Sequence, residues 1–203
     1  MERRTAVVTG ASRGIGKASA IALAQKGFDV AITARTMSKE DQSPEPSGLS
    51  AVTLPGSLEE TAEIIRSFKV QAFPFYMDLM ERDSLVPTAE AIISKLGHVD
   101  VLLSNAVYSG PGNYGRFWTT ILTMCRSNFR QYYCSDVFLK PILASMVKQG
   151  SGTMLFMTSA CSVRAPSHMP GKVVGGSIYR IQRWLSPLAV QLGYEYGDDG
   201  ITR

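Results

Sequence analysis

Residues 5–17 read TAVVTGASRGIGK, and this stretch decides the fold. Thr5–Thr9 are small, apolar or β-branched throughout, which predicts a buried strand. Three glycines follow directly, at Gly10, Gly14 and Gly16, and a segment of helical period begins among them. The absent side chains at such a turn let backbone N–H groups and the helix N-terminus meet a pyrophosphate. The stretch therefore predicts a dinucleotide site at the first turn of an α/β fold.

A nucleoside-triphosphate loop is the main alternative for these glycines. That loop needs a Gly-Lys pair followed by Ser or Thr, whose hydroxyl binds magnesium. Here Ala18 follows Lys17, and Ala11 stands where the first glycine of that loop should be. Both positions argue against a triphosphate loop, and we keep the dinucleotide interpretation.

Short apolar runs alternate with segments of helical period along the rest of the chain. The runs predict five buried strands, at Thr5–Thr9, Asp29–Ala34, Gln71–Met77, Val99–Ser104 and Thr153–Thr158. The intervening segments predict helices at Ile15–Lys26, Leu58–Phe68, Asp83–Leu96, about 116–148 and Ser177–Tyr194. Because parallel strands need right-handed crossovers, we expect a doubly wound parallel sheet in a single domain over residues 1–203. Its ligands should lie beyond the carboxyl ends of the strands.

Two segments stand outside this rhythm. Residues 38–57 are rich in proline, glycine and serine, which predicts a long surface loop. Ile201 and Thr202 would begin a sixth strand just before Arg203. We therefore expect a sheet that lacks its last strands and leaves the fifth strand as an edge.

Composition indicates a globular domain. The chain has 203 residues, of which 45% are hydrophobic and 19% charged, and its mean hydropathy is +0.03. The net charge of +4 is scattered, so nucleic acid is not an expected partner. No segment resembles a signal peptide or is apolar enough to span a bilayer, so we expect no membrane partner.

Cysteine and histidine usage points away from disulfides and metals. Cys125, Cys134 and Cys161 form no CxxC pair, and their odd number argues for a reducing, cytoplasmic location. His98 and His168 have no partners at metal-ligand spacing, so we expect no metal.

Four further sites along the chain match, in the same order, the motif positions of a known protein family. Asp78–Leu79 follow the third strand, Asn105–Ala106 follow the fourth, Asn128 lies in the long helix, and Ser159 closes GTMLFMTS. Together with TGASRGIG, these positions make the chain resemble the short-chain dehydrogenase/reductase family, whose members bind NAD(P) on one Rossmann domain. The family motif Asn-Asn-Ala-Gly is degraded here, since Ser104 and Val107 replace its outer residues.

The resemblance implies a cofactor site along the glycine turn and at the ends of the second, third and fourth strands. The implied cofactor-binding residues are Gly10, Ser12, Arg13, Gly14, Ile15, Gly16, Arg35, Asp78, Leu79, Asn105 and Ala106.

Charge at the end of the second strand predicts which cofactor binds. A carboxylate there would hydrogen-bond a ribose diol and repel a 2′-phosphate. This chain instead has Ala34–Arg35, with Arg13 in the glycine turn. Because a guanidinium fork suits phosphate, we expect NADP (NADPH) as the cofactor.

The resemblance also implies a proton-transfer site. A free phenol titrates near about 10, so the family places a lysine one helical turn after its tyrosine to favour phenolate. Here Tyr179 begins YRIQR, with Arg183 at the lysine position. The resemblance implies that Ser159 hydrogen-bonds the reacting oxygen, that Tyr179 is the general acid in reduction and that Asn128 holds the helix and a water chain.

Arg183 departs from the family because arginine does not readily release a proton to a relay. Leu188–Ala189 also follow Tyr179 sooner than the resemblance requires. Either the helix starts differently, or a segment carrying the lysine is absent. The long interval between Ser159 and Tyr179 predicts an active-site loop at 163–176.

We expect an NADP-dependent oxidoreductase that acts on a carbonyl or secondary alcohol as a homodimer or homotetramer. The alternative is a non-catalytic NADP-binding sensor or partner-binding module, favoured by Arg183 and Val107. An epimerase or dehydratase of the extended branch is disfavoured, because its glycines are spaced one residue tighter.

Overall fold

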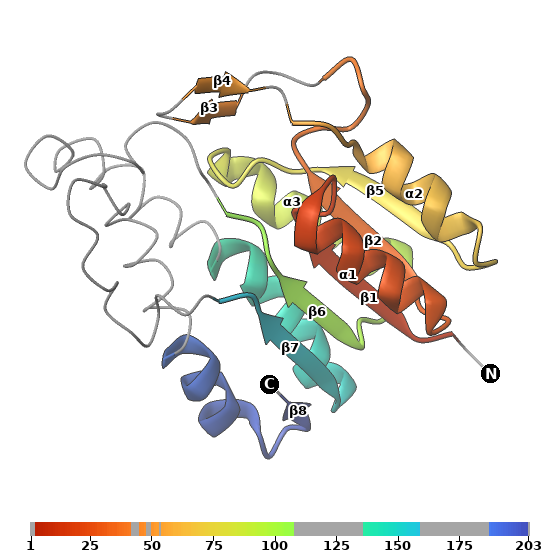
Figure 1. The fold of residues 1–203 in the computed structure, drawn as a ribbon. Helices are drawn as coiled ribbons and strands as arrows, with labels where there is room; N and C mark the ends of the chain where they lie inside the picture. The colour runs from red at the N-terminus through yellow and green to blue at the C-terminus, as the bar shows by residue number, and fades with distance from the viewer. Residues whose placement is uncertain are drawn as a thin grey trace, which may run out of the picture.

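One parallel sheet of six strands organises the molecule (Figure 1). The computed structural model describes residues 3–41, 45–47, 50–52, 54–107, 136–158 and 187–202. Within them the sheet has the order β5-β2-β1-β6-β7-β8. The strands are β1 (Thr5–Thr9), β2 (Asp29–Ala34), β5 (Ala72–Tyr76), β6 (Val101–Ser104), β7 (Gly152–Phe156) and β8 (Ile201–Thr202).

The direction of winding reverses between β1 and β6. The chain runs outward from β1 through β2 to β5, and then crosses back to β6, β7 and β8 on the other side of β1. All five neighbouring pairs are parallel. This doubly wound topology confirms the predicted fold class, and its switch point lies at the carboxyl ends of β1 and β6.

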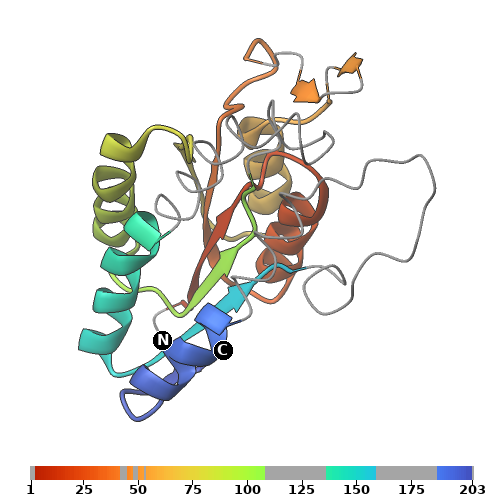
Figure 2. The ribbon, with the colours of Figure 1, turned by 90° about the vertical axis from the view of Figure 1, so that its left-hand side faces the viewer.

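Helices cover both faces of the sheet (Figure 2). They are α1 (Gly14–Gln25), α2 (Leu58–Arg66), α3 (Arg82–Leu96) and the helical residues 136–149 and 187–196. On one face, Ala6 and Val8 of β1 pack in a core shared with α1 and α2. Val7 packs on the opposite face with α3 and helix 136–149. Because both faces are buried, the strands read as the continuous apolar runs from which they were predicted.

Two expectations about irregular segments were wrong. The predicted surface loop at 38–57 contains an antiparallel hairpin of β3 (Glu45–Ser47) and β4 (Ser50–Val52). Strands of three residues are too short to show an alternating hydrophobic pattern, and the prolines and serines around them indicate a loop. Likewise β7 is not the sheet edge, because Ile201 pairs with Gly152 and Thr202 with Thr153.

The remaining boundaries agree within a few residues. β6 begins two residues later than expected and β7 ends two residues earlier, as is common at element ends. The expected helices at about 116–148 and Ser177–Tyr194 are described only over 136–149 and 187–196.

β5 is the outermost strand on its side of the sheet, and Pro74 lies at its centre opposite Ile32 of β2. Met77 donates its N–H to Ala34, which places the odd-numbered residues of this segment toward β2. The even-numbered positions face outward, and there the carbonyl of Ala72 accepts a hydrogen bond from Arg66 Nη2 (3.1 Å).

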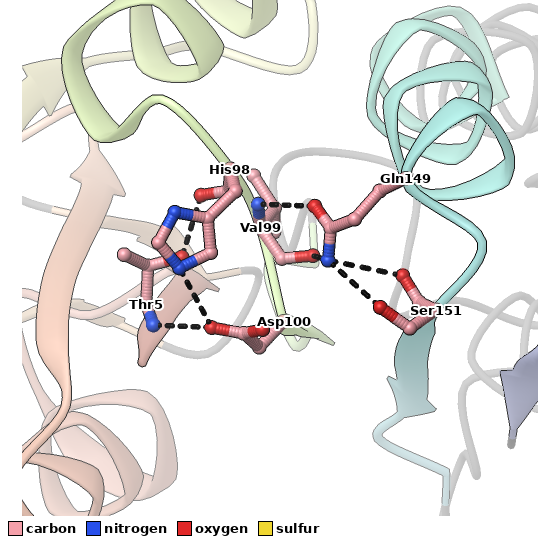
Figure 3. Close-up of polar contacts among 6 residues, drawn as sticks. All are labelled: Thr5, His98, Val99, Asp100, Gln149 and Ser151. Atoms are coloured by element: carbon pink, nitrogen blue, oxygen red, sulfur yellow. Dashed lines mark hydrogen bonds and ion pairs between the residues drawn. The ribbon is translucent and has the colours of Figure 1, made fainter. Parts of the chain in front are cut away.

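A polar network ties the amino ends of β1, β6 and β7 together (Figure 3). The Thr5 N–H donates to Asp100 Oδ2 (2.7 Å), and the Thr5 hydroxyl donates to the His98 carbonyl (2.5 Å). His98 Nε2 lies 3.2 Å from the same Asp100 oxygen. Gln149 bridges the backbones of Val99 and Ser151. The network lies at the end of the sheet opposite the glycine turn, so it serves the fold.

The described part of the chain contains no cluster of three or more side chains suited to hold a metal ion. No helix within it combines the length and the apolar character that crossing a bilayer requires.

Candidate functional site

The turn after β1 has a backbone that only glycine permits at two positions. Gly10 adopts φ +70°, and a Cβ on it would lie 3.0 Å from Ala106 Cα. A Cβ on Gly16 would come within 3.0 Å of the Gly10 carbonyl oxygen. The N–H groups of Gly10 and Ala11 both donate to the Thr33 carbonyl at the end of β2 (2.7 and 3.0 Å). The turn is therefore compact and fixed to two strands.

Asn105 fastens the end of β6 to this turn. Its Nδ2 donates to the carbonyls of Thr9 (2.9 Å) and Gly10 (3.3 Å). The Thr9 hydroxyl oxygen in return accepts the N–H groups of Asn105 and Ala106 (both 2.9 Å). These bonds close the switch point between β1 and β6. The sequence predicted Asn105 and Ala106 as site residues. It did not predict Thr9, because in the sequence Thr9 is simply the last residue of a strand.

A cavity of about 290 Å³ opens at the carboxyl ends of β1, β2, β5 and β6. It brings together nine of the predicted residues, namely Gly10, Ser12, Arg13, Ile15, Arg35, Asp78, Leu79, Asn105 and Ala106. Gly14 and Gly16 lie in the same turn but do not line the cavity. Residues that sequence reasoning did not place there also line it: Ala34, Thr36, Leu54, Met77 and Val107.

Basic side chains lie at the end of β2. Arg13 is half-buried, and its Nη2 donates to Thr36 Oγ1 (3.0 Å), which joins the glycine turn to the residue after Arg35. Arg35 is exposed and lines the cavity. Among the described lining residues, Asp78 is the one acidic group, and its Oδ1 accepts the N–H of Met80 (2.8 Å). The end of β2 is thus suited to an anionic group.

Tyr76 is the described tyrosine nearest in sequence to the cavity residues, and it is not suited to proton transfer. Burial, followed by the hydrogen bond of its hydroxyl to Glu81 Oε1 (3.2 Å), raises the pKa of the Tyr76 phenol. A phenol that gives and takes a proton near neutrality needs the opposite shift.

The predicted catalytic residues lie outside the described residues. This applies to Asn128, Ser159, Tyr179 and Arg183, and to the expected active-site loop at 163–176. After β7 ends at Phe156, the structure describes two more residues of this segment, Met157 and Thr158. The N–H of Met157 donates to the Ser104 carbonyl (2.9 Å).

The parallel sheet and the cavity at its switch point define a doubly wound α/β protein. The chain belongs to the short-chain dehydrogenase/reductase family, because the family model described as short chain dehydrogenase matches residues 4–45 and 47–171. Members of this family use nicotinamide cofactors.

Individual relatives agree with this assignment. The 7alpha-hydroxysteroid dehydrogenase of Escherichia coli (strain K12) is 30% identical over 164 residues, which cover 78% of this chain and 54% of that protein. Hydroxysteroid dehydrogenase-like protein 2 of Bos taurus is 32% identical over 102 residues, covering 50% of this chain and 22% of that protein. The chain therefore spans only a fraction of the length of these curated relatives.

Solved structures share the fold over nearly the whole chain. Acetoin dehydrogenase YohF from Salmonella typhimurium has a TM-score of 0.77 at 27% identity, covering 98% of this chain and 73% of that one. Carveol dehydrogenase from Mycobacterium avium, solved in complex with NAD, has a TM-score of 0.70 at 20% identity over 98% of this chain and 67% of that one. At that identity, the second similarity concerns the fold alone.

Proposed function

We propose that the protein is an NADP-dependent oxidoreductase that transfers a hydride between the cofactor and a carbonyl or secondary alcohol. The observation that carries this proposal is the cavity at the switch point, which has Arg13 and Arg35 beside it and no carboxylate at the end of β2. The family assignment supports the reaction class. The names of the relatives, which include dehydrogenases of hydroxysteroids and of acetoin, support an alcohol–carbonyl pair as substrate.

The described residues fit such a cofactor. A side chain on Gly10 would press against Asn105 and Ala106, and one on Gly16 would overlap the Gly10 carbonyl. These glycines therefore let the turn pack tightly at the switch point, where a diphosphate would bind. Arg13, Arg35 and Thr36 supply side-chain donors for a 2′-phosphate. Ser12, Asp78 and Asn105 are the other polar side chains that line the cavity, and Asp78 and Asn105 would help to position an adenosine and its ribose. When bound, NADPH supplies the hydride, and these residues hold and orient it.

Proton transfer is assigned through the family pattern. Ser159 would hydrogen-bond the reacting oxygen, and Tyr179 would donate the proton in reduction. Arg183 would favour the phenolate through its permanent charge, while Asn128 would hold the helix and a water chain. Because an arginine does not release its proton, we expect proton delivery to be slower than with a lysine.

A comparison of cofactor affinities tests the central proposal. NADPH and NADH are titrated into the protein by their fluorescence. We expect NADPH to bind about tenfold or more tightly, because each charge-assisted hydrogen bond to the 2′-phosphate adds about 1.5–3 kcal/mol. Equal affinities would overturn the preference for NADP, and absence of binding would overturn the dinucleotide site.

A second candidate function is an NADP-binding sensor without catalysis. Arg183 stands at the lysine position, and Val107, which is 49% exposed, lines the cavity where the family motif has glycine. Turnover measured over a panel of ketones and aldehydes separates the two functions. NADPH binding without turnover on any of them favours the sensor.

We also propose that the enzyme works in the cytoplasm as a homodimer or homotetramer on a small-molecule substrate. The family assignment supports an oligomer. Light scattering coupled to size exclusion checks this, and a mass near 22.1 kDa would contradict it.

A further inference from the structure

The segment 54–61, which comprises the end of the predicted 38–57 loop and the start of α2, lies directly against the glycine turn. Gly56 is buried and adopts φ +114°. A Cβ on it would come within 3.0 Å of the Ser12 carbonyl oxygen and 3.2 Å from Arg13 Cβ. The segment and the turn can approach this closely only because position 56 has no side chain.

Thr61 makes a second contact with the same turn from the first turns of α2. Its side chain is fully buried, and its Oγ1 lies 3.0 Å from the Ala11 carbonyl oxygen and 3.0 Å from that of Ser57. The single hydroxyl proton serves both acceptors. The Ala11 carbonyl therefore depends on α2 for its hydrogen bond.

A third contact joins the starts of the two helices. Lys17 Nζ of α1 lies 2.5 Å from Glu60 Oε1 of α2. The Ser57 side chain caps α2 by accepting the N–H of Glu60 (3.2 Å). The beginning of α2 is thus held by its own cap at Ser57 and by the ion pair with α1, the helix that follows the glycine turn.

These contacts act on the peptide units that face the cavity. A peptide unit is planar and trans, so its N–H points opposite to its carbonyl. Thr61 holds the carbonyl of Ala11, and this sets the direction of the Ser12 N–H. Gly56 packs on the carbonyl of Ser12, and this confines the Arg13 N–H. Ser12 and Arg13 both line the cavity.

We propose that residues 54–61 position the glycine turn for the cofactor diphosphate, with Gly56 and Thr61 as positioning residues. This inference rests on the proposed function, since it takes a dinucleotide as the ligand. It assigns a binding role to the end of a segment for which composition alone predicts only a surface loop.

Three threonine variants test the contact of Thr61. Thr61→Val removes the hydroxyl, Thr61→Ser keeps it, and Thr5→Val removes another buried hydroxyl at the opposite end of the sheet (Figure 3). Dissociation constants for NADPH and ADP are measured by calorimetry, together with the melting temperature of the free protein. We expect Thr61→Val to weaken both ligands about fivefold to tenfold, the equivalent of one hydrogen bond, and Thr61→Ser to restore them. Thr5→Val should lower the melting temperature and leave both constants unchanged.

Two glycine variants test the contact of Gly56. They test the proposal on their own if Thr61→Val does not fold. Gly56→Ala and Gly97→Ala both place a side chain at positive φ, but nothing lies within 4 Å of a Cβ at Gly97. Both variants should lose stability, because both are strained. Only Gly56→Ala should weaken NADPH and ADP, by about tenfold.

The outcomes separate the inference from the proposed function. If the unaltered protein binds neither NADPH nor ADP, the proposed function fails and the inference fails with it. If the unaltered protein binds both, the inference alone is overturned when Thr61→Val and Gly56→Ala bind as tightly as it does. It is equally overturned when Thr5→Val and Gly97→Ala lose as much affinity as their counterparts.

Discussion

Arg35 is the residue on which the proposed choice of cofactor depends most directly, because it is the exposed cation that follows β2. Replacing it by glutamate puts a carboxylate where a ribose diol would be bound and a 2′-phosphate repelled. We expect Arg35→Glu to weaken NADPH at least about tenfold and to leave NADH equal or tighter. Fluorescence titration with both cofactors measures this.

Arg82→Glu is the matched control for that variant. Arg82 is also exposed, and its replacement by glutamate changes the net charge by the same amount. Arg82 begins α3, however, and does not line the cavity. An equal loss of NADPH affinity in Arg82→Glu would trace the effect to overall charge and remove Arg35 from the site.

Tyr179 carries the second prediction at the scale of single residues. Tyr179→Phe removes the hydroxyl that we assign to proton donation and leaves the ring in place. We expect turnover to be abolished and the dissociation constant for NADPH to be unchanged. Turnover is followed by NADPH absorbance with an accepted carbonyl substrate. Retained turnover would remove Tyr179 from the mechanism.

Individual site residues were predictable from the sequence where backbone chemistry requires them. Gly10 and Gly16 belong to a turn whose geometry forbids side chains, and Asn105 comes at the end of a recognisable strand. Thr36 and Thr61 were not predictable, because a hydroxyl that bonds a distant carbonyl or guanidinium has no local pattern. Asn128, Ser159, Tyr179 and Arg183 stay predictions.

At the scale of elements, α1 and α2 are joined at their starts by the pair of Lys17 and Glu60. The hydrogen bond from Lys17 lowers the pKa of the Glu60 carboxyl below its ordinary value of 4.5. A carboxyl whose pKa is depressed by folding stabilises the fold above its unfolded pKa, and the contribution disappears as pH falls through the folded pKa.

This sign gives an expected outcome for Glu60→Gln. The variant should be slightly less stable than the unaltered protein at neutral pH. The difference should shrink as pH falls below the ordinary carboxyl pKa of 4.5 and vanish once pH is below the lowered pKa of Glu60. Urea unfolding at several pH values measures it. A difference that persists unchanged at low pH would show that the side chain acts by packing and not by charge.

The helices and buried strands were predictable because each carries a long apolar pattern that its burial requires. The hairpin of β3 and β4 was not, since three-residue strands pair through backbone groups that every sequence possesses. β8 was predicted at its residues, Ile201 and Thr202, but its pairing with β7 was not. Its two residues pair with β7, and the hydroxyls of Thr153 and Thr202 meet at 2.7 Å.

At the scale of the whole molecule, the two ends of the sheet have separate tasks. The carboxyl ends hold the cavity, and the amino ends hold the network around Thr5 and Asp100. Asp100→Ala leaves the Thr5 N–H without its acceptor, so we expect a loss of about 1–3 kcal/mol in the free energy of unfolding. The dissociation constant for NADPH of the folded protein should not change. Urea unfolding and calorimetry check the two parts, and a weakened NADPH affinity would contradict the separation.

The topology as a whole followed from the sequence, because right-handed crossovers between parallel strands leave few arrangements. The position of the cavity followed in turn, since Gly10, Asp78 and Asn105 each come directly after a predicted strand. Substrate identity did not follow, because neither the strand pattern nor the residues that line the cavity encode it.

Pro74 at the centre of the outermost strand bears on how copies of the protein behave in a crowded solution. The outward side of β5 has no N–H at position 74, and its carbonyl at Ala72 is taken by Arg66. A foreign β-segment that tried to zip onto this border would lose ladder bonds midway along it. The border of the sheet formed by β5 is therefore a poor template for pairing with a strand of another molecule.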